Sequence, residues 1–283
     1  MSPEARKQLS QTVVALQGPD GFFCGRAGQE DLYYTFFGLL LATVTCAKIR
    51  RKVCYAKLSS VDFSLLDLVH ASVWLRAMKL LRWLAVPCFL RMMIPASQWN
   101  MFDIFLSRKL QSLSNLPQHA YPQQNAGSPY SRFLLGTLST DFSQSSPEFD
   151  LAAYRLPNGL YANLQHHGEY GVNATAAALF LLPPDQCQET VDALAALQEP
   201  DGSFKAAASA PEGDLMSTAT AAFALQRCGQ GNNAARNPTL PVSPKSFLRE
   251  CFRDDGLFAA TPHDPDGDLE YTAYGLLLMG VIS

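Results

Sequence analysis

The sequence predicts an all-α protein of about six helical hairpins, closed into a ring. The first observation behind this prediction is an internal repeat: a glycine turn, a polar loop and a capped apolar helix follow one another four times. The second is regular spacing, since the turn glycine precedes a threonine by 16 residues in three copies and by 14 in the first. The third is composition, because 48% of the 283 residues are hydrophobic and can fill one core shared by all repeats. We therefore expect a single domain over residues 1–283.

The repeat is clearest near the end of the chain, where Asp255-Gly256 suits a turn that needs positive φ. Asp268 stands four residues before Thr272, the position of an N-cap for the apolar helix that follows. Each copy therefore forms the middle of a helical hairpin. The other copies run from Gly21 to Thr35, Gly159 to Thr175 and Gly202 to Thr218, with Asp31, Gly171 and Asp214 at the capping position. The clear repeats are expected over residues 3–47, 148–182, 186–228 and 245–283.

Two further units are expected in the long interval between Gly21 and Gly159, which is 138 residues or close to three spacings of 46. We place these divergent hairpins at residues 48–96 and 100–142, with Ser131 in the place of the repeat threonine in the second. Helices are expected at 3–17 and 31–47 as well.

The segment 48–91 is locally basic, with nine Lys and Arg residues against two Asp. Arg76, Lys79 and Arg82 are three apart, which predicts one basic face on a helix. That face is either solvated on the outside of the protein or a surface for an acidic partner or a membrane. Charged residues interrupt the apolar run at 64–86 too often for a membrane-spanning helix.

The net charge and the cysteine pattern limit the classes of function that we expect. A net charge of −3 gives no reason to expect nucleic acid as a partner. The seven cysteines are odd in number and form no CxxC pair, so we interpret them as reduced thiols. Ser2-Pro3 at the start resembles a helix N-cap rather than a secretory signal, and the expected location is cytoplasmic.

The turn-and-cap repeats resemble those of the α/α toroid superfamily, which includes protein prenyltransferase β-subunits and squalene-hopene and related terpene cyclases. Four units, about half of the chain, carry the resemblance. It implies that the helix after each glycine turn lies in the inner ring, with its N-terminus at the mouth of a central apolar cavity. Such a mouth suits an isoprenoid diphosphate, because helix N-termini favour anions. No cofactor is expected apart from Mg²⁺ accompanying a diphosphate.

The zinc motif of the prenyltransferase β-subunits is incomplete in this sequence. Asp214 occupies the place of the aspartate ligand, but Met216 stands at the cysteine position and Tyr271 at the histidine position. A thioether and a phenol are poor ligands for zinc, so we predict that this metal site has been lost.

The acidic motif of the terpene cyclases is also altered. Asp268-Leu269-Glu270-Tyr271-Thr272 resembles Asp-x-Asp-Asp-Thr, with Glu270 in place of the proton-donating Asp. A glutamate in an apolar pocket has a raised pKa, whereas protonating an alkene demands a stronger acid. The alternative is that Glu270 is an ordinary exposed helix residue and that each Asp is only a helix cap.

From this resemblance, Asp214, Asp268 and Glu270 are the candidate catalytic residues. The aromatic residues of the inner helices suit an isoprenoid chain. The expected ligand pocket comprises Asp31, Tyr34, Phe37, Tyr271 and Tyr274. Two functions follow as expectations: isoprenoid binding with transfer or cyclisation, or a non-catalytic toroid scaffold that uses the segment 48–91 for a partner.

Overall fold

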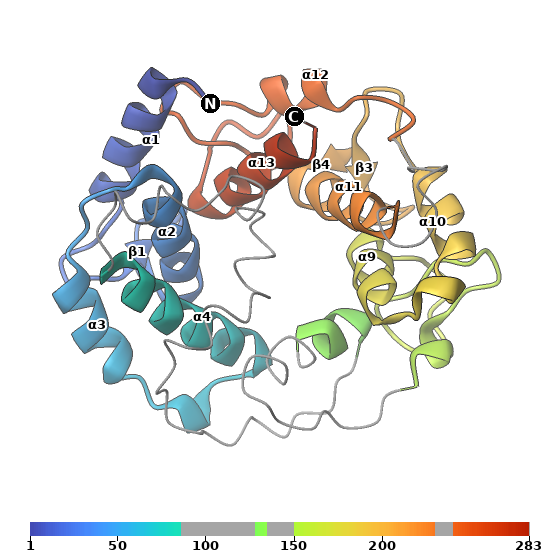
Figure 1. The fold of residues 1–283 in the computed structure, drawn as a ribbon, viewed down its shortest axis with the longest axis horizontal. Helices are drawn as coiled ribbons and strands as arrows, with labels where there is room; N and C mark the ends of the chain where they lie inside the picture. Colours follow the sequence, from blue (N-terminus) through green and yellow to red (C-terminus); the bar gives the residue numbers. More distant parts are fainter. Residues whose placement is uncertain (86–127, 135–149, 230–239, 283) are drawn as a thin grey trace.

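The computed structural model describes residues 1–85, 128–134, 150–229 and 240–282 (Figure 1). These residues are mostly helical, which confirms the all-α prediction. The α-helices are α1 (Pro3–Ala15), α2 (Leu32–Thr45), α3 (Arg51–Ser59), α4 (Leu68–Ala85), α9 (Val172–Leu181), α10 (Gln188–Ala195), α11 (Leu215–Gly229), α12 (Lys245–Glu250) and α13 (Leu269–Val281), together with a short helix at 129–134. Short 3₁₀ turns lie at Phe63–Leu65, Leu151–Tyr154 and Pro184–Gln186. Two antiparallel hairpins pair β1 (Phe23–Cys24) with β2 (Glu30–Asp31) and β3 (Phe204–Lys205) with β4 (Gly213–Asp214).

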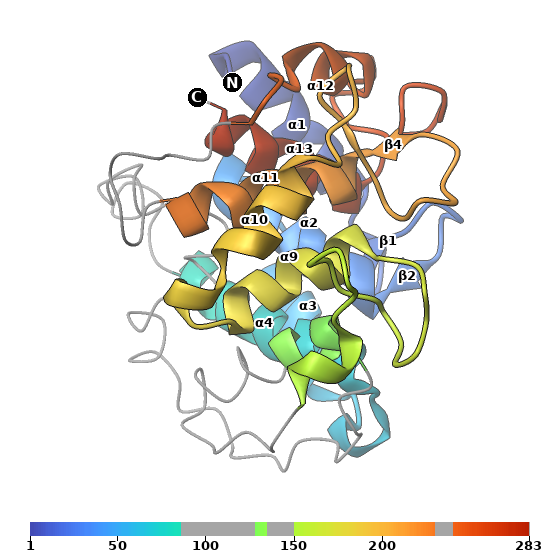
Figure 2. The same cartoon turned by 90° about the vertical axis from the view of Figure 1, so that its right-hand side faces the viewer.

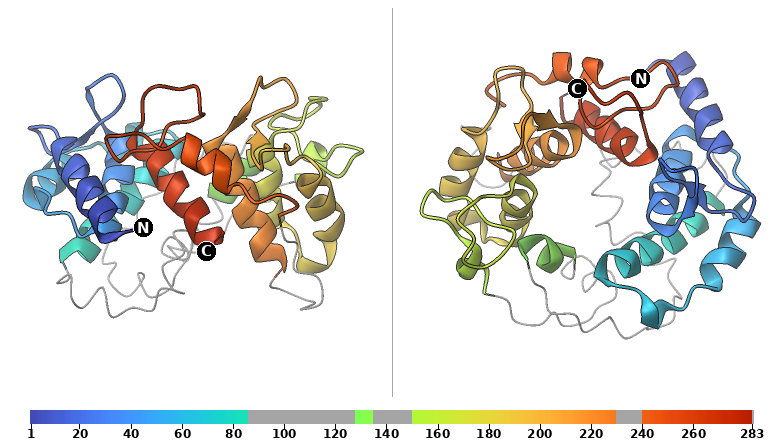
Figure 3. Two further views of the ribbon diagram at one scale, coloured as in Figure 1. Left: turned by 90° about the horizontal axis from the view of Figure 1, so that it is seen from above. Right: turned by 180° about the vertical axis from the view of Figure 1, so that it is seen from behind.

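The helices form an inner and an outer layer. In the inner layer α9, α11, α13, α2 and α4 each pack against the next, and they surround the centre of the molecule in Figure 1. Helices α1, α3 and α10 pack on the outside of this series, and Figure 2 shows α10 in front of α9 and α11. The loops that precede α2, α11 and α13 project from one common edge (Figure 3). The inner helices therefore begin on the same side of the molecule.

The recurring turn-and-threonine pattern has one structural explanation in all four copies. The turn glycines have positive φ: Gly21 (99°), Gly159 (81°), Gly202 (87°) and Gly256 (86°). Each repeat threonine is fully buried, and its hydroxyl bonds the carbonyl of the capping residue. The same oxygen accepts the backbone N–H of an aromatic residue just after the turn, over 2.9–3.0 Å, in the pairs Thr35 with Phe23, Thr175 with Tyr161, Thr218 with Phe204, and Thr272 with Phe258. The threonine thus joins the turn to the first turn of the inner helix.

The predicted caps are confirmed. The carboxylates of Asp31, Asp214 and Asp268 accept the backbone N–H three residues on, at 2.9, 2.8 and 2.8 Å. Gly171 caps α9 without a side chain. The helices expected over 3–17 and 31–47 are observed as Pro3–Ala15 and Leu32–Thr45, each a little shorter than predicted.

The first and last inner helices, α2 and α13, pack against each other, and with α1 they share one hydrophobic core, which includes Leu9 of α1, Leu39 of α2 and Leu277 of α13. Backbone carbonyls at Asp254 and Asp255 accept hydrogen bonds from Gln8 (2.6 Å) and Thr12 (2.8 Å) of α1. The earliest and latest parts of the described chain are therefore held together directly.

The basic face predicted in the segment 48–91 is largely internal. Arg76 and Lys79 are 8% and 7% exposed, so the interpretation of these residues as a solvated outer face is wrong. The reason is that α4 belongs to the inner layer, next to α2. Arg50, the residue just before α3, donates hydrogen bonds to the backbone carbonyls of Gln17 and Gly18. Its guanidinium therefore stabilises the fold.

Two other expectations concern the cysteines and the membrane. Cys46 is disulfide-bonded, so the interpretation of all seven cysteines as reduced thiols is wrong at this position. The other described cysteines are not in disulfides. None of the helices in the described ranges is both long enough and apolar enough to cross a bilayer.

Candidate binding cavity

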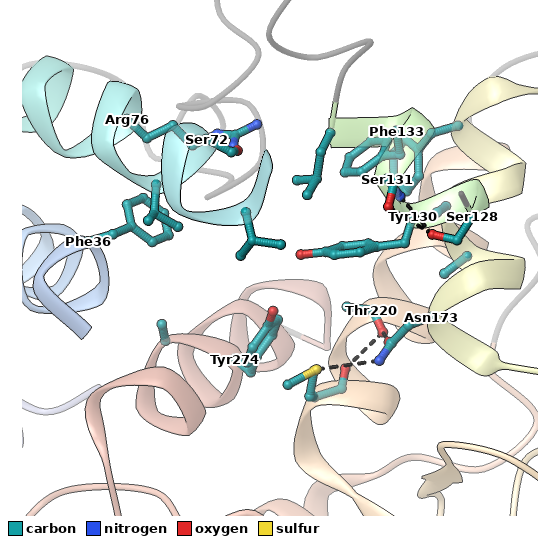
Figure 4. A pocket seen from close by; sticks show the side chains of 18 of the residues that line it. Phe36, Ser72, Arg76, Ser128, Tyr130, Ser131, Phe133, Asn173, Thr220 and Tyr274 are labelled. Carbon is teal, nitrogen blue, oxygen red and sulfur yellow. Dashed lines mark hydrogen bonds between the residues drawn. The ribbon is translucent and has the colours of Figure 1, made fainter. Parts of the chain in front are cut away.

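The inner layer lines a cavity of about 810 Å³, which is within the range of roughly 300–1,000 Å³ that is usual for small-molecule sites. Its wall comes from α2, α4, the short helix at 129–134, α9, α11 and α13 (Figure 4). The aromatic residues of the wall are Tyr33, Phe36, Phe37, Tyr130, Phe133, Phe180, Phe223 and Tyr274. A cavity with this lining suits an apolar or unsaturated ligand.

The aromatic side chains support one another around the cavity. Phe180 of α9 stacks on Phe223 of α11 with ring centroids 5.7 Å apart, and Phe133 packs on Phe180 at 5.1 Å. On the other side, Phe37 of α2 and Tyr274 of α13 are 6.2 Å apart. These contacts join neighbouring inner helices and fix the rings of the wall.

The lining residues follow a common register, counted from the capping residue of each inner helix. In the four clear repeats, the second, sixth and ninth residues after the cap face the cavity, except that Glu270 lies just behind the wall. The second positions are Tyr33, Asn173, Met216 and Glu270; the sixth are Phe37, Ala177, Thr220 and Tyr274; the ninth are Leu40, Phe180, Phe223 and Leu277. Steps of three and four residues place these positions on one face of a helix.

Helix α4 follows the same register. Asp67 accepts the backbone N–H of His70 at 2.8 Å and so caps α4. The second and ninth residues after this cap are Val69 and Arg76, and both line the cavity. The short helix at 129–134 starts from Ser128, which accepts the N–H of Ser131 at 3.0 Å. Ser131 is three residues after this cap, whereas each repeat threonine is four residues after its own, so Ser131 does not take the place of the repeat threonine.

A polar network on the α9–α11 side of the cavity is internally satisfied. Thr220 donates to Asn173 at 2.5 Å, and the amide of Asn173 lies 3.4 Å from the sulfur of Met216. Figure 4 shows Thr220 and Asn173 on the side of the cavity opposite Ser72 and Arg76. Their polar atoms are already used within the protein.

Glu270 is buried, with 7% of its surface exposed, so the alternative of an ordinary exposed helix residue is wrong. It sits in the first turn of α13, where α2 packs against it, and the hydroxyl of Tyr33 donates to its carboxylate at 2.5 Å. Burial raises the pKa of Glu270 to about 7, although the Tyr33 hydrogen bond opposes the shift. Tyr33 lines the cavity, so its hydroxyl group links the carboxylate of Glu270 to the cavity wall by a hydrogen bond.

Asp268 is 5% exposed and is bound by Arg26 from the β1–β2 loop, with Nε 2.6 Å from the carboxylate. Arg26 also pairs with Asp264 at 2.8 Å and lies 5.3 Å from the ring centre of Tyr271. Burial and the neighbouring Asp268 raise the pKa of Tyr34 to about 12. This cluster links the first repeat to the last and lies behind the cavity wall.

Asp214 caps α11 and accepts the hydroxyl of Ser217 at 2.7 Å. Burial raises the pKa of its carboxyl group. Within the described ranges, no three His, Cys, Asp or Glu side chains gather in a way that could hold a metal ion. Asp214 is therefore a half-buried cap whose hydrogen bonds are satisfied within its own helix.

Of the residues predicted for the site, Phe37 and Tyr274 line the cavity. The others lie at the starts of the inner helices, outside the lining: Asp31, Tyr34, Asp214, Asp268, Glu270 and Tyr271. Sequence reasoning missed Ser72, Arg76, Asn173 and Thr220. Aligning the helices by their caps would have brought Asn173, Thr220 and Arg76 to the second, sixth and ninth positions, which face the cavity. A comparison with known protein families and a search among curated proteins both returned no match.

Proposed function

We propose that this chain is an α/α toroid of about six hairpins whose central cavity binds an isoprenoid or similar apolar chain. The observation that carries the proposal is the aromatic cavity at the centre of the inner layer. It corresponds to the cavity that the resemblance to prenyltransferase β-subunits and terpene cyclases implies.

The cavity-facing register supports the toroid arrangement. Six helix starts contribute residues to one cavity, including α4 and the helix at 129–134, which fall within the two divergent units at 48–96 and 100–142. A closed ring is the arrangement that presents the same face of every inner helix to one centre. The six-hairpin count and the single domain over 1–283 are part of this proposal.

Isoprenoid transfer or cyclisation is the chemistry that we propose for the site if it is catalytic. Glu270 favours an acid–base step, because it is buried and bonded to the cavity-lining Tyr33. A carboxyl group with a pKa of about 7 is a weak acid, so it is suited to an activated intermediate and poorly suited to protonating an unactivated alkene. Asp214 and Asp268 remain candidates at the helix starts. Ligand binding is therefore the function with the stronger support.

The first experiment is native mass spectrometry of the purified protein with farnesyl and geranylgeranyl diphosphate, with and without Mg²⁺, together with elemental analysis for zinc. We expect saturable one-to-one binding and no stoichiometric zinc. Phe223→Ala should weaken binding by removing a ring from the wall, whereas Tyr55→Ala, on the exposed surface of α3, serves as the matched control. Stoichiometric zinc would overturn the predicted loss of the metal site. Absence of any ligand would favour the scaffold function, with the exposed Lys48 and Lys52 as the first partner surface to test.

A further inference from the structure

Two tyrosine hydroxyls, those of Tyr130 and Tyr274, point toward the middle of the cavity (Figure 4). Both residues occupy cavity-facing positions of the register: Tyr130 is the second residue after the Ser128 cap, and Tyr274 is the sixth after Asp268. The two phenols lie close enough for Tyr130 to add to the rise in the pKa of Tyr274 that burial causes. They belong to different inner helices, so the fold brings them together.

The hydroxyls of these two tyrosines are not used by the rest of the described protein. Within the described ranges, neither forms a hydrogen bond with another residue. By contrast, the hydroxyl of Tyr33 donates to Glu270 at 2.5 Å. Thr220 likewise donates to Asn173. A third lining hydroxyl, that of Ser72, is buried and also has no hydrogen-bond partner in the described part of the chain. The wall therefore offers hydrogen bonds that a ligand can complete.

Tyr130 combines an accessible ring with a buried environment. Of its surface 39% is exposed, yet burial raises the pKa of its phenol. Both hold because the residue lines the cavity, where a small molecule can reach the ring while protein surrounds it. The raised pKa values keep the hydroxyls of Tyr130 and Tyr274 protonated and uncharged at neutral pH. Each can then donate one hydrogen bond and accept another.

From this arrangement we infer that the cavity recognises an apolar chain that carries an uncharged oxygen, as an isoprenoid alcohol does, and that Tyr130 and Tyr274 hydrogen-bond this oxygen. An alcohol both donates and accepts, so it can form one bond with each phenol. Such hydrogen bonds offset the burial of an uncharged oxygen, whereas the burial of a full charge also demands an opposite charge. The inference rests on the proposed isoprenoid cavity and adds the polar group of the ligand and the residues that bind it.

The test measures the dissociation constants of farnesol and of farnesene, which has the same fifteen carbons and no oxygen, by equilibrium dialysis at pH 7.5. Tyr130→Phe and Tyr274→Phe each remove one hydroxyl and keep the ring. Each variant should weaken farnesol binding about threefold to tenfold, the effect of losing one hydrogen bond, and leave farnesene binding unchanged. Unchanged farnesene binding also shows that the variant is folded with its cavity intact. Each ligand is compared with itself between proteins, so the different solubilities of the two ligands cancel.

Tyr55→Phe is the matched control, since it removes a phenol hydroxyl from the exposed surface of α3 and should change neither dissociation constant. If both lining variants bind farnesol as tightly as the wild-type protein does, or weaken farnesol and farnesene equally, the inference is overturned and the isoprenoid cavity stands. If neither ligand binds to the wild-type protein, the cavity proposal itself is overturned.

Discussion

Replacing Thr35 by Val tests the explanation of the repeat most directly. The two side chains have nearly the same shape, but Val lacks the hydroxyl that accepts the N–H of Phe23 at 2.9 Å. Both residues are fully buried, so the N–H of Phe23 would be left without an acceptor. An orphaned buried donor costs about 1–3 kcal/mol, and the free energy of unfolding should fall by that amount.

Thr43→Val, in the same helix, is the matched control. Thr43 is also fully buried, but its hydroxyl only donates to the carbonyl of Leu39 at 2.8 Å, within the helix. Removing this hydroxyl leaves no buried N–H group without an acceptor, so the free energy of unfolding should change by less than about 1 kcal/mol. Urea unfolding followed by circular dichroism measures both. If Thr35→Val costs no more than Thr43→Val, the threonine does not hold the turn and this explanation of the repeat is wrong.

Three further predictions concern single side chains. For Glu270→Gln, the pKa of about 7 means that the folded state keeps a proton that the unfolded chain has lost; the wild-type protein should therefore lose stability relative to the variant as pH rises from about 4.5 to about 7, measured by urea unfolding at each pH. Gly202→Ala should destabilise the protein by more than about 1 kcal/mol, because φ is +87° and a Cβ would lie 2.7 Å from a backbone atom, as a thermal melt can check. Arg26→Gln removes the cation beside the buried Asp268 and should cost about 1–3 kcal/mol in urea unfolding, more so at low salt.

Two of these changes, Gly202→Ala and Arg26→Gln, have a control variant in the same chain. Gly28 also has positive φ (74°), but nothing lies within 4 Å of a Cβ there, so Gly28→Ala should be milder than Gly202→Ala. Arg155 pairs with Glu189 on the surface, and Arg155→Gln should cost less than about 1 kcal/mol. An equal loss of stability in a variant and its control would contradict the explanation of that variant. A stability difference between the wild-type protein and Glu270→Gln that does not vary with pH would contradict the raised pKa of Glu270.

The inner helices that open a clear repeat could be predicted because their determinants are local. A glycine with positive φ, an Asp cap and a threonine lie within 17 residues of one another, for example from Gly256 to Thr272. These residues act mainly on their own turn and helix, so the pattern survives in the sequence. In α4 the glycine turn and the threonine are missing, and only the Asp67 cap remained to be found.

The site could be predicted less well, because its residues act between helices. Glu270 was placed at the surface as one alternative, yet α2 covers it and supplies the Tyr33 hydroxyl. The spacing of Arg76 and Lys79 predicts a basic helix face that is either solvated or bound to a partner, whereas both residues are buried. The inner helices are covered on nearly all sides, so a charge there does not mark the solvent side.

The contacts between the first and last repeats have a consequence for biosynthesis. They join residues far apart in sequence: the hydrogen bond between Arg26 and Asp268 spans 242 positions, and that between Tyr33 and Glu270 spans 237. Until α13 has emerged from the ribosome, the apolar inner faces of α2 and α11 lack a neighbour and stay accessible to other chains. Such late-forming contacts slow folding and expose chains to aggregation. A nascent chain halted before residue 268 should therefore depend on chaperones that shield apolar surface.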